Sequence, residues 1–317
     1  MKKRRIYYLL FTVLVLIGCE KDIEIALNEQ SDKLVMYAFV YPDSALHLHL
    51  SKSQNILTPN DYQKVEKGRF ELAINDDYKG TYILPSDTVW SRWAEFSFSS
   101  KDRLIFNAYE IDGDTVLARS FIPHKVNILA LDTLSVNVNV GEEVDVPMLR
   151  TTVSFKDPGD EKNYYQLYVL REGWGVEDGK VNYTRQTVSY AKEDPVFTQG
   201  EQSGSLLPGL DLQGLFADDI INGRTHPLRL NIPSEYFLFS YHEQKIKITV
   251  YLYHHTIDYY EYLRSTILAD GYAGIYEGLP VFEPVKIHSN VKGGLGLVSG
   301  MNFDSDSLVF TRDIRHE

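Results

Sequence analysis

Between residues 33 and 122 the chain repeats one pattern, in which short stretches of alternating apolar and polar residues are separated by turn sequences. A period of two places successive side chains on opposite faces of an extended chain, so each stretch predicts a half-buried β-strand. Turn sequences such as Asn75-Asp76-Asp77 fit between them, because Asn and Asp tolerate the left-handed backbone of tight hairpins. Seven short strands at this spacing predict a β-sandwich of immunoglobulin or fibronectin type over residues 33–124. The predicted strands are 33–41, 45–52, 69–75, 80–84, 94–98, 103–110 and 115–122.

Residues 125–317 predict a second β-rich domain with long loops. Residues 126–146 form one extended stretch that could bridge the two domains. Residues 172–214, apart from 180–190, lose regular alternation and gain glycines, which is typical of long loops. Residues 257–268 repeat apolar side chains at spacings of three and four, which predicts one short helix. Residues 282–300 predict a strand, a glycine-rich turn and a second strand. The expected fold class is therefore mainly β, with an N-terminal sandwich followed by a second β-rich domain with one short helix.

The N-terminal segment has the pattern of a secretory signal. Four basic residues at positions 2–5 precede an apolar run over residues 6–17, which is too short to span a bilayer comfortably. Leu16, Ile17, Gly18 and Cys19 look like a bacterial lipobox, at which the cysteine is acylated and the preceding segment is removed. We expect a signal peptide at 1–18, lipidation of Cys19 and a tether over 19–32. Two or more acyl chains on one cysteine give stable anchoring, since each buried methylene contributes about 0.8 kcal/mol.

Charge and cysteine content exclude several function classes. Removing residues 1–18 leaves 299 residues and removes four of the 32 basic ones, so 28 basic residues face 44 acidic ones, a net charge of −16. A surface this acidic repels phosphate backbones, so we expect no nucleic-acid partner. Cys19 is the single cysteine, and its use for lipid leaves no thiol for a disulfide, a thiolate metal site or a cysteine nucleophile.

Three groups of residues have metal-ligand chemistry, but each has an ordinary structural explanation that we favour. His47 and His49 alternate with leucines, which predicts a strand whose histidines face solvent. Residues 157–163 place several hard oxygen ligands in one loop, yet the spacing lacks the EF-hand pattern, so a turn with side-chain hydrogen bonds is favoured and calcium stays open. The third group has the side chains of a zinc site: His254, His255, Asp258 and Glu261. The two acids would lie in the first turn of the predicted helix, where the helix dipole favours negative charge, so we favour that explanation. We therefore predict no metal and no cofactor.

Two further positions have open alternatives. Trp174 lies between two glycines in the predicted loop region. It is either an exposed platform for a sugar ring or a peptide, or a plug within the fold. Asn290 and the glycines after it form either a backbone nest for an anion or a hairpin turn, and we favour the turn.

Three motifs carry a family resemblance. They are KLVMYAFVYPD from Lys33, D-P-x-x-x-x-N-Y-Y over 157–165, and F-E-P-V-x-I-x-S-N-V-x-G-G-x-G over 282–296. Together with the lipobox and the acidic residues 20–24, they resemble the Bacteroidetes lipoproteins grouped as domain-of-unknown-function family 4249. The resemblance implies a neighbouring TonB-dependent outer-membrane receptor as partner. No functional residues are established for that family, so none is transferred.

These observations lead to one principal expectation and one alternative. We expect a non-enzymatic lipoprotein, attached to the outer membrane by its lipid and facing the cell surface, that assists a TonB-dependent receptor in nutrient capture or uptake. The alternative is a stand-alone glycan- or peptide-binding surface module, which predicts exposed aromatic residues such as Trp90, Trp93 and Trp174. A hydrolase is disfavoured because neither G-x-S-x-G nor H-E-x-x-H occurs.

Overall fold

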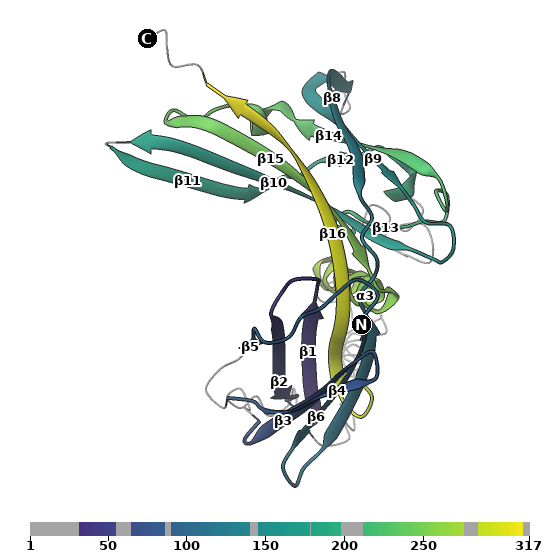
Figure 1. Cartoon of the computed structure of the whole chain (residues 1–317). Helices are drawn as coiled ribbons and strands as arrows, with labels where there is room; N and C mark the ends of the chain where they lie inside the picture. Colours follow the sequence, from purple (N-terminus) through teal and green to yellow (C-terminus); the bar gives the residue numbers. More distant parts are fainter. Residues whose placement is uncertain are drawn as a thin grey trace, which may run out of the picture.

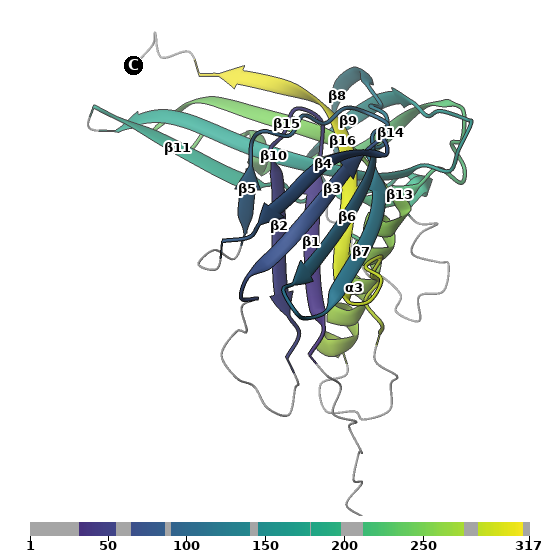
Figure 2. The same cartoon turned by 60° about the horizontal axis from the view of Figure 1, so that its bottom comes forward.

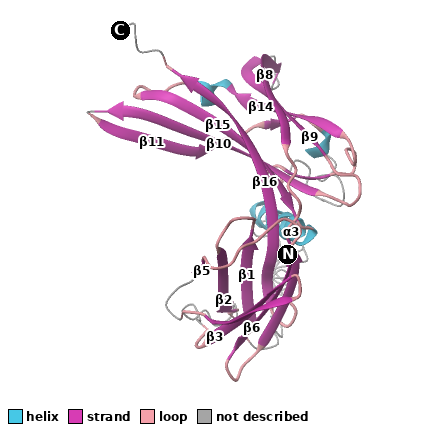
Figure 3. Ribbon diagram, viewed as in Figure 1, coloured by secondary structure: helices cyan, strands magenta, loops and turns pink. Residues whose placement is uncertain are grey.

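In the computed structural model, strands make up both halves of the chain (Figures 1 and 3). The structure describes residues 32–54, 65–85, 90–139, 145–177, 179–197, 212–275 and 285–312. The predicted lipobox, including Cys19, and the predicted tether up to residue 31 lie outside these ranges, as do residues 198–211 of the predicted loop region. Within them, the predicted fold class is confirmed: one β-sandwich is followed by a second β-rich domain with a single helix longer than one or two turns.

The strands have the following bounds. They are β1 (Leu34–Val40), β2 (Leu46–Lys52), β3 (Gly68–Ile74), β4 (Asp77–Ile83), β5 (Ser91–Trp93), β6 (Arg103–Glu110), β7 (Thr115–Phe121), β8 (Ile128–Asn139), β9 (Asp145–Lys156), β10 (Tyr164–Glu177), β11 (Lys180–Thr187), β12 (Ala191–Lys192), β13 (Leu215–Ala217), β14 (Thr225–Pro233), β15 (Glu243–His255) and β16 (Leu295–Thr311). The helix α3 spans Ile257–Ile275, and a short 3-10 helix spans Ser234–Phe237.

The first sandwich packs the sheet β4-β3-β6-β7 against a sheet that contains β1, β2 and β5. Alternation explains its core: the residues of β1 at positions 34, 36, 38 and 40 are buried, whereas Val35, Tyr37 and Phe39 are half-buried on the other face. Asn75 and Asp76 connect β3 to β4 with positive φ values of 54° and 68°, as a two-residue hairpin turn requires. The predicted strands occur close to their predicted bounds except the fifth, which lies at Ser91–Trp93 instead of 94–98.

The second domain packs β11, β10, β15 and part of β16 against the four-stranded sheet β12-β14-β9-β8. Figure 1 shows β10, β11 and β15 extending together as an arm. The stretch 126–146, predicted as a bridge between domains, instead contributes β8, which pairs with β9 along its whole length. Long alternating segments pair with a neighbour because unpaired backbone groups in an isolated extended chain gain no ladder hydrogen bonds.

Strand β16 belongs to both domains. Its first part pairs with β1 in parallel, from Leu295 to Gly300, and its second part pairs with β15 in antiparallel fashion, from Met301 to Thr311. Seventeen residues at about 3.3 Å each give a strand of about 55 Å, long enough to run through both bodies (Figure 1). Val291 and Val298 accordingly lie in the first core, so the sandwich expected at 33–124 is completed by residues that we expected in the domain 125–317.

Helix α3 lies alongside β16, against the face of the eight-stranded sheet that points away from the first core (Figure 2). Its Tyr262 ring contacts Tyr37 of β1, with centroids 6.1 Å apart, and its Tyr259 ring contacts Phe39 at 5.8 Å. The helix begins after Thr256, whose hydroxyl accepts a hydrogen bond from the Tyr259 amide at 3.4 Å, the N-cap arrangement. Among the described residues no helix has the length and apolar character needed to cross a bilayer.

Candidate functional site

Five aromatic residues gather on one face of the eight-stranded sheet, and we call them the aromatic strip: Tyr41, Tyr168, Tyr251, Tyr253 and Phe303. The strand register brings them together, because Tyr168 of β10 lies opposite Tyr251 of β15, and Tyr253 lies opposite Phe303 of β16. Tyr41 follows β1 directly, so the strip starts on the first domain and ends on the second. Its strands β10, β15 and β16 lie side by side in Figure 1.

The rings of the strip form a continuous series of contacts. Phe303 is 6.1 Å from Tyr41, 5.4 Å from Tyr253 and 6.1 Å from Tyr251, measured between ring centroids. Tyr251 is in turn 6.3 Å from Tyr168 and stacks on Tyr253 at 6.1 Å. Offset and edge-to-face pairs at these distances stabilise one another and hold the rings in place. The strip is therefore a pre-ordered surface.

The strip faces away from the packed core. Leu167, Val169 and Leu252, which alternate with its tyrosines, are fully buried between the sheets. Tyr41 is 38% exposed, and the other four members are half-buried. Partial burial, followed by the neighbouring Tyr251 and Tyr168, raises the pKa of Tyr253, so its phenol stays protonated at neutral pH. The strip thus offers apolar ring faces with neutral hydroxyl groups at their edges.

Trp174 extends the same face farther along the arm. It lies in β10 opposite Tyr183 of β11, with ring centroids 5.6 Å apart, and the Lys245 ammonium lies 5.2 Å from the indole. The prediction that Trp174 sits in a loop is wrong, because Trp174 lies within β10, where it is half-buried.

The glycines beside Trp174 suggested a loop, but both are required by close packing against the neighbouring strand. A Cβ on Gly173 would lie 2.0 Å from a Glu243 carboxylate oxygen, and one on Gly175 would lie 1.9 Å from the His242 carbonyl oxygen. Glycine is therefore needed within this strand for the close approach of the neighbouring chain.

A groove of about 300 Å³ adjoins the strip at Tyr168. Polar groups line it, including Gln166 of β10, Thr187 at the end of β11 and Ser189. The Tyr168 hydroxyl shares a hydrogen bond of 2.6 Å with the Thr187 hydroxyl. A flat aromatic surface next to hydroxyl and amide groups suits a ligand with both apolar faces and hydrogen-bonding edges, or an aromatic-rich protein interface.

The other two tryptophans are not part of this surface. Trp90 is 43% exposed and contacts Phe39 and His49 of the first domain. Trp93 packs against the first core, with its ring centroid 4.6 Å from that of Phe70. Of the three tryptophans predicted as platforms, Trp93 is therefore a packing residue.

The histidines of β2 do not share one environment. His47 is exposed, whereas His49 is buried beneath Tyr37 and Trp90 and hydrogen bonds to Ser51 at 2.9 Å. The prediction of two solvent-facing histidines is thus wrong for His49, because rings from outside the strand cover that face.

The residues weighed as calcium ligands are engaged in other bonds. Asp157 is fully buried, and its carboxylate accepts hydrogen bonds from the Tyr165 hydroxyl at 2.6 Å and the Gly223 amide at 2.8 Å. Asn163 donates to the carbonyl oxygens of Pro158 and Glu161. Within the described ranges no three acidic, histidine or cysteine side chains are placed to hold a metal ion. The loop has the side-chain hydrogen bonds expected of a turn.

The two histidines weighed as zinc ligands at the end of β15 do not point to one site either. His254 and His255 lie on opposite faces of the strand: the His254 Nδ1–H group donates to the His124 carbonyl oxygen at 2.9 Å, and the His255 ring stacks on Tyr259 with centroids 4.3 Å apart. Burial lowers the pKa of His254 to about 4 and that of His255 to about 3, so both are neutral near pH 7. They are packing residues at the junction of the domains.

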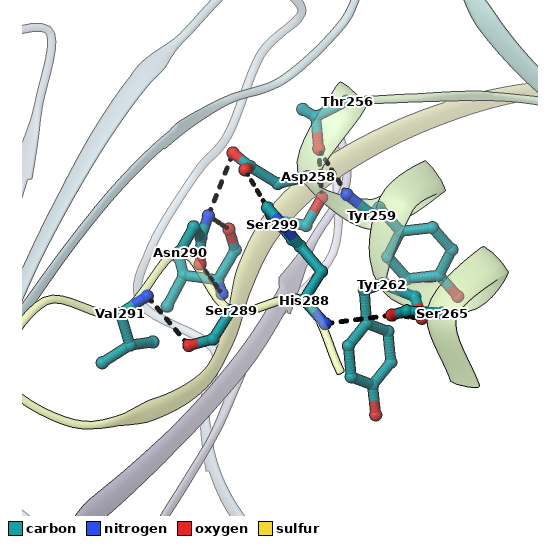
Figure 4. A network of polar contacts seen from close by, with 11 residues as sticks. Thr256, Asp258, Tyr259, Tyr262, Ser265, His288, Ser289, Asn290, Val291 and Ser299 are labelled. Carbon is teal, nitrogen blue, oxygen red and sulfur yellow. Dashed lines mark hydrogen bonds and ion pairs between the residues drawn. The ribbon is translucent and has the colours of Figure 1, made fainter. Parts of the chain in front are cut away.

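Asp258 joins a polar network instead of only capping its helix (Figure 4). One carboxylate oxygen lies 2.8 Å from His288 Nε2, and the other accepts from the Asn290 amide at 3.2 Å. Asn290 also pairs with the Val298 backbone, donating to its carbonyl at 2.8 Å and accepting from its amide at 3.0 Å. Residues 285–291 are therefore held by side chains, and the first strand predicted over 282–300 is absent from its described part.

The strip itself was not predicted. Its sequence signal was the period-two tyrosines of NYYQLY and YLY, which place Tyr168, Tyr251 and Tyr253 on alternate positions of two strands. Only the register of β10, β15 and β16 shows that these positions share a face.

Comparison with known proteins gives a family and little beyond it. No curated protein matches the chain. Among solved structures, a segment of two fibronectin type-III domains from chicken tenascin matches with 8% identity and a TM-score of 0.22, covering 89% of this chain and 99% of that one. The family model described as "Domain of unknown function (DUF4249)" matches residues 20–307. Because this match covers most of the sequence, the chain belongs to the DUF4249 family.

Proposed function

We propose that this protein is a non-enzymatic, lipid-anchored lipoprotein of the outer membrane, facing the cell surface, that assists a TonB-dependent receptor in nutrient capture, and that the aromatic strip is its binding surface. The observation that carries the binding role is the series of ring contacts from Tyr41 to Tyr168 on an uncovered sheet face. Aromatic residues are enriched where proteins bind partners, because large rigid rings bury much area at low entropic cost. The anchor and the receptor rest on the lipobox and on the resemblance.

The anchor predicts a clear result for Cys19. A Cys19→Ala variant lacks the thiol that would be acylated, so it is expected to incorporate no labelled palmitate and to leave the membrane fraction. Fractionation of cells that express each form, with labelled palmitate, measures both effects. Because an uncut or misrouted precursor would also lack label, the N-terminal mass of the wild-type protein is determined in parallel. Unmodified Cys19 in the wild type would contradict the anchor.

The strip predicts a loss of receptor association on removal of two rings. Tyr168→Ala combined with Tyr251→Ala removes adjacent ring faces, and we expect recovery of a β-barrel receptor from solubilised outer membranes to fall about tenfold or more. Tyr241→Ala is the matched control, since Tyr241 is 87% exposed and lies outside the strip. Circular dichroism confirms that the double variant is folded. Equal recovery with both variants would remove the strip from the interface.

The groove beside Tyr168 favours a second candidate, a stand-alone module that binds a glycan or peptide. Gln166, Thr187 and Ser189 supply hydrogen-bonding groups next to a ring face, the combination that sugars require. Glycan and peptide arrays probed with the purified protein separate the two functions. Binding to an array that is lost in the Tyr168→Ala variant supports the module, whereas receptor recovery without array binding supports the accessory role.

A further inference from the structure

Two cavities flank Arg119 on strand β7 of the first sandwich. One, of about 300 Å³, is lined by Leu117, Arg119, Ser289, Asn290, Val291 and Lys292. We call it the Arg119 cavity. The other, of about 410 Å³, is lined by Arg119, by Asp76 of the turn between β3 and β4, and by residues of β6, β7 and α3, among them Arg103 and Asp258. The two differ in charge, since the Arg119 cavity has two basic and no acidic residues in its lining.

Both cations of the Arg119 cavity lack protein partners within the part of the chain that the structure describes. Arg119 and Lys292 are exposed and make no hydrogen bond or ion pair through their side chains there. Other cations on the same domain are paired: Arg103 lies 2.5 Å from Asp76, and Lys52 lies 2.7 Å from Glu110. In a chain with 44 acidic and 32 basic residues, two unpaired cations that line one cavity leave a local excess of positive charge.

The wall that carries Lys292 is rigidly held. The Lys292 backbone pairs with Leu117 of β7, donating to its carbonyl at 2.8 Å and accepting from its amide at 3.0 Å. The preceding residues are held by side-chain hydrogen bonds. His288 bonds to Asp258 in the network of Figure 4, and the Asn290 side chain bonds to both the amide and the carbonyl of Val298. The Asp258 carboxylate bonds to these two side chains, and among the described residues it forms no ion pair with Arg119. Because the backbone of this wall is already ordered, ligand binding does not have to order it.

We propose that the Arg119 cavity binds the carboxylate of a small ligand, either an acidic sugar or the carboxyl terminus of a peptide. A guanidinium presents paired N–H donors that match a carboxylate in bidentate geometry, and the lysine ammonium adds a point charge. The site is separate from the aromatic strip and independent of receptor association.

Titration calorimetry on the soluble protein without residues 1–19 tests this proposal, since the described fold begins after that segment. The probes are galacturonate oligomers and a tripeptide with a free carboxyl terminus, compared with neutral galactose oligomers and the amidated tripeptide. We expect binding of one carboxylate probe with a Kd of about 1 mM or below, and at least about tenfold weaker binding of its neutral counterpart. Which probe binds identifies the source of the carboxylate.

Matched variants locate the binding. Arg119→Met keeps an unbranched apolar stem and removes the guanidinium charge, so it should weaken binding about tenfold or more, and Lys292→Met should weaken it less. Arg103→Met is the control, because Arg103 lines the other cavity and already pairs with Asp76, and it should change affinity less than about twofold. Tighter binding of inorganic phosphate, equal binding of neutral probes, or unchanged affinity in Arg119→Met would overturn the proposal.

Discussion

Replacing Arg171 with alanine is expected to lower the free energy of unfolding by about 3–5 kcal/mol, the cost of leaving one member of a buried ion pair alone. Arg171 of β10 forms a bidentate pair with Glu243 of β15 at 2.9 and 2.5 Å, and both side chains are at most 7% exposed. Its guanidinium also donates to the carbonyl oxygens of Tyr236 and Leu238. The variant therefore loses the pair and releases the segment that precedes β15.

Urea denaturation followed by circular dichroism measures this change. Arg103→Ala is the matched control: its pair with Asp76 has the same 2.5 Å distance but about two-thirds exposed side chains, so solvent screening limits its loss to about 0–1 kcal/mol. A difference below about 1 kcal/mol between the two variants would mean that the buried pair contributes no more than a surface pair.

Acidification from pH 7 to pH 5 is expected to destabilise the protein by about 2 kcal/mol for each of two histidines. The folded protein holds the pKa of His254 at about 4 and that of His255 at about 3 by burial, against an ordinary value of 6.5. In the window between these values the unfolded chain binds more protons than the folded one, so the free energy of unfolding falls as pH falls. The loss begins near pH 6.5 and continues until the folded values are reached.

The buried carboxylates do not reverse this fall of the free energy of unfolding between pH 7 and pH 5. The pair with Arg171 lowers the pKa of Glu243 to about 2, so its contribution is lost only below its ordinary value of 4.5. Burial raises the pKa of Asp157, which opposes the histidines at the acid end of the window.

Urea denaturation at pH 7, 6 and 5 measures the slope of the free energy of unfolding against pH. His255→Gln removes one titrating group and should reduce the slope by about half, whereas His47→Gln, at an exposed position, should leave it unchanged. A slope that is flat in the wild type, or equally steep in His255→Gln, would show that these histidines do not carry the acid sensitivity.

Local sequence determined most of the secondary structure. The alternation of LVMYAFV predicts β1 and its buried face, because strand geometry assigns faces residue by residue. Asn75-Asp76 predicts the hairpin between β3 and β4, since its two-residue backbone requires positive φ. The start of the helix at Ile257 was predicted as well, although the helix continues to Ile275 instead of ending at 268. Prediction failed for the part of β10 from Glu172 onward, where Gly173 and Gly175 suggested a loop but serve the approach of Glu243 and His242.

What the sequence determined by itself is therefore the set of strands, their faces and the family, because period, turn residues and motifs are local properties. Tertiary structure decided how those strands meet. Leu295 pairs with Val35 and Phe303 with Tyr253, and no local pattern specifies partners so far apart in the chain. The strip and the Arg119 cavity are products of that pairing: the strip joins β10, β15 and β16, and the cavity forms where residues 289–292 lie against β7. Both surfaces arise from contacts between distant segments, which is the physical reason that the sequence did not reveal them.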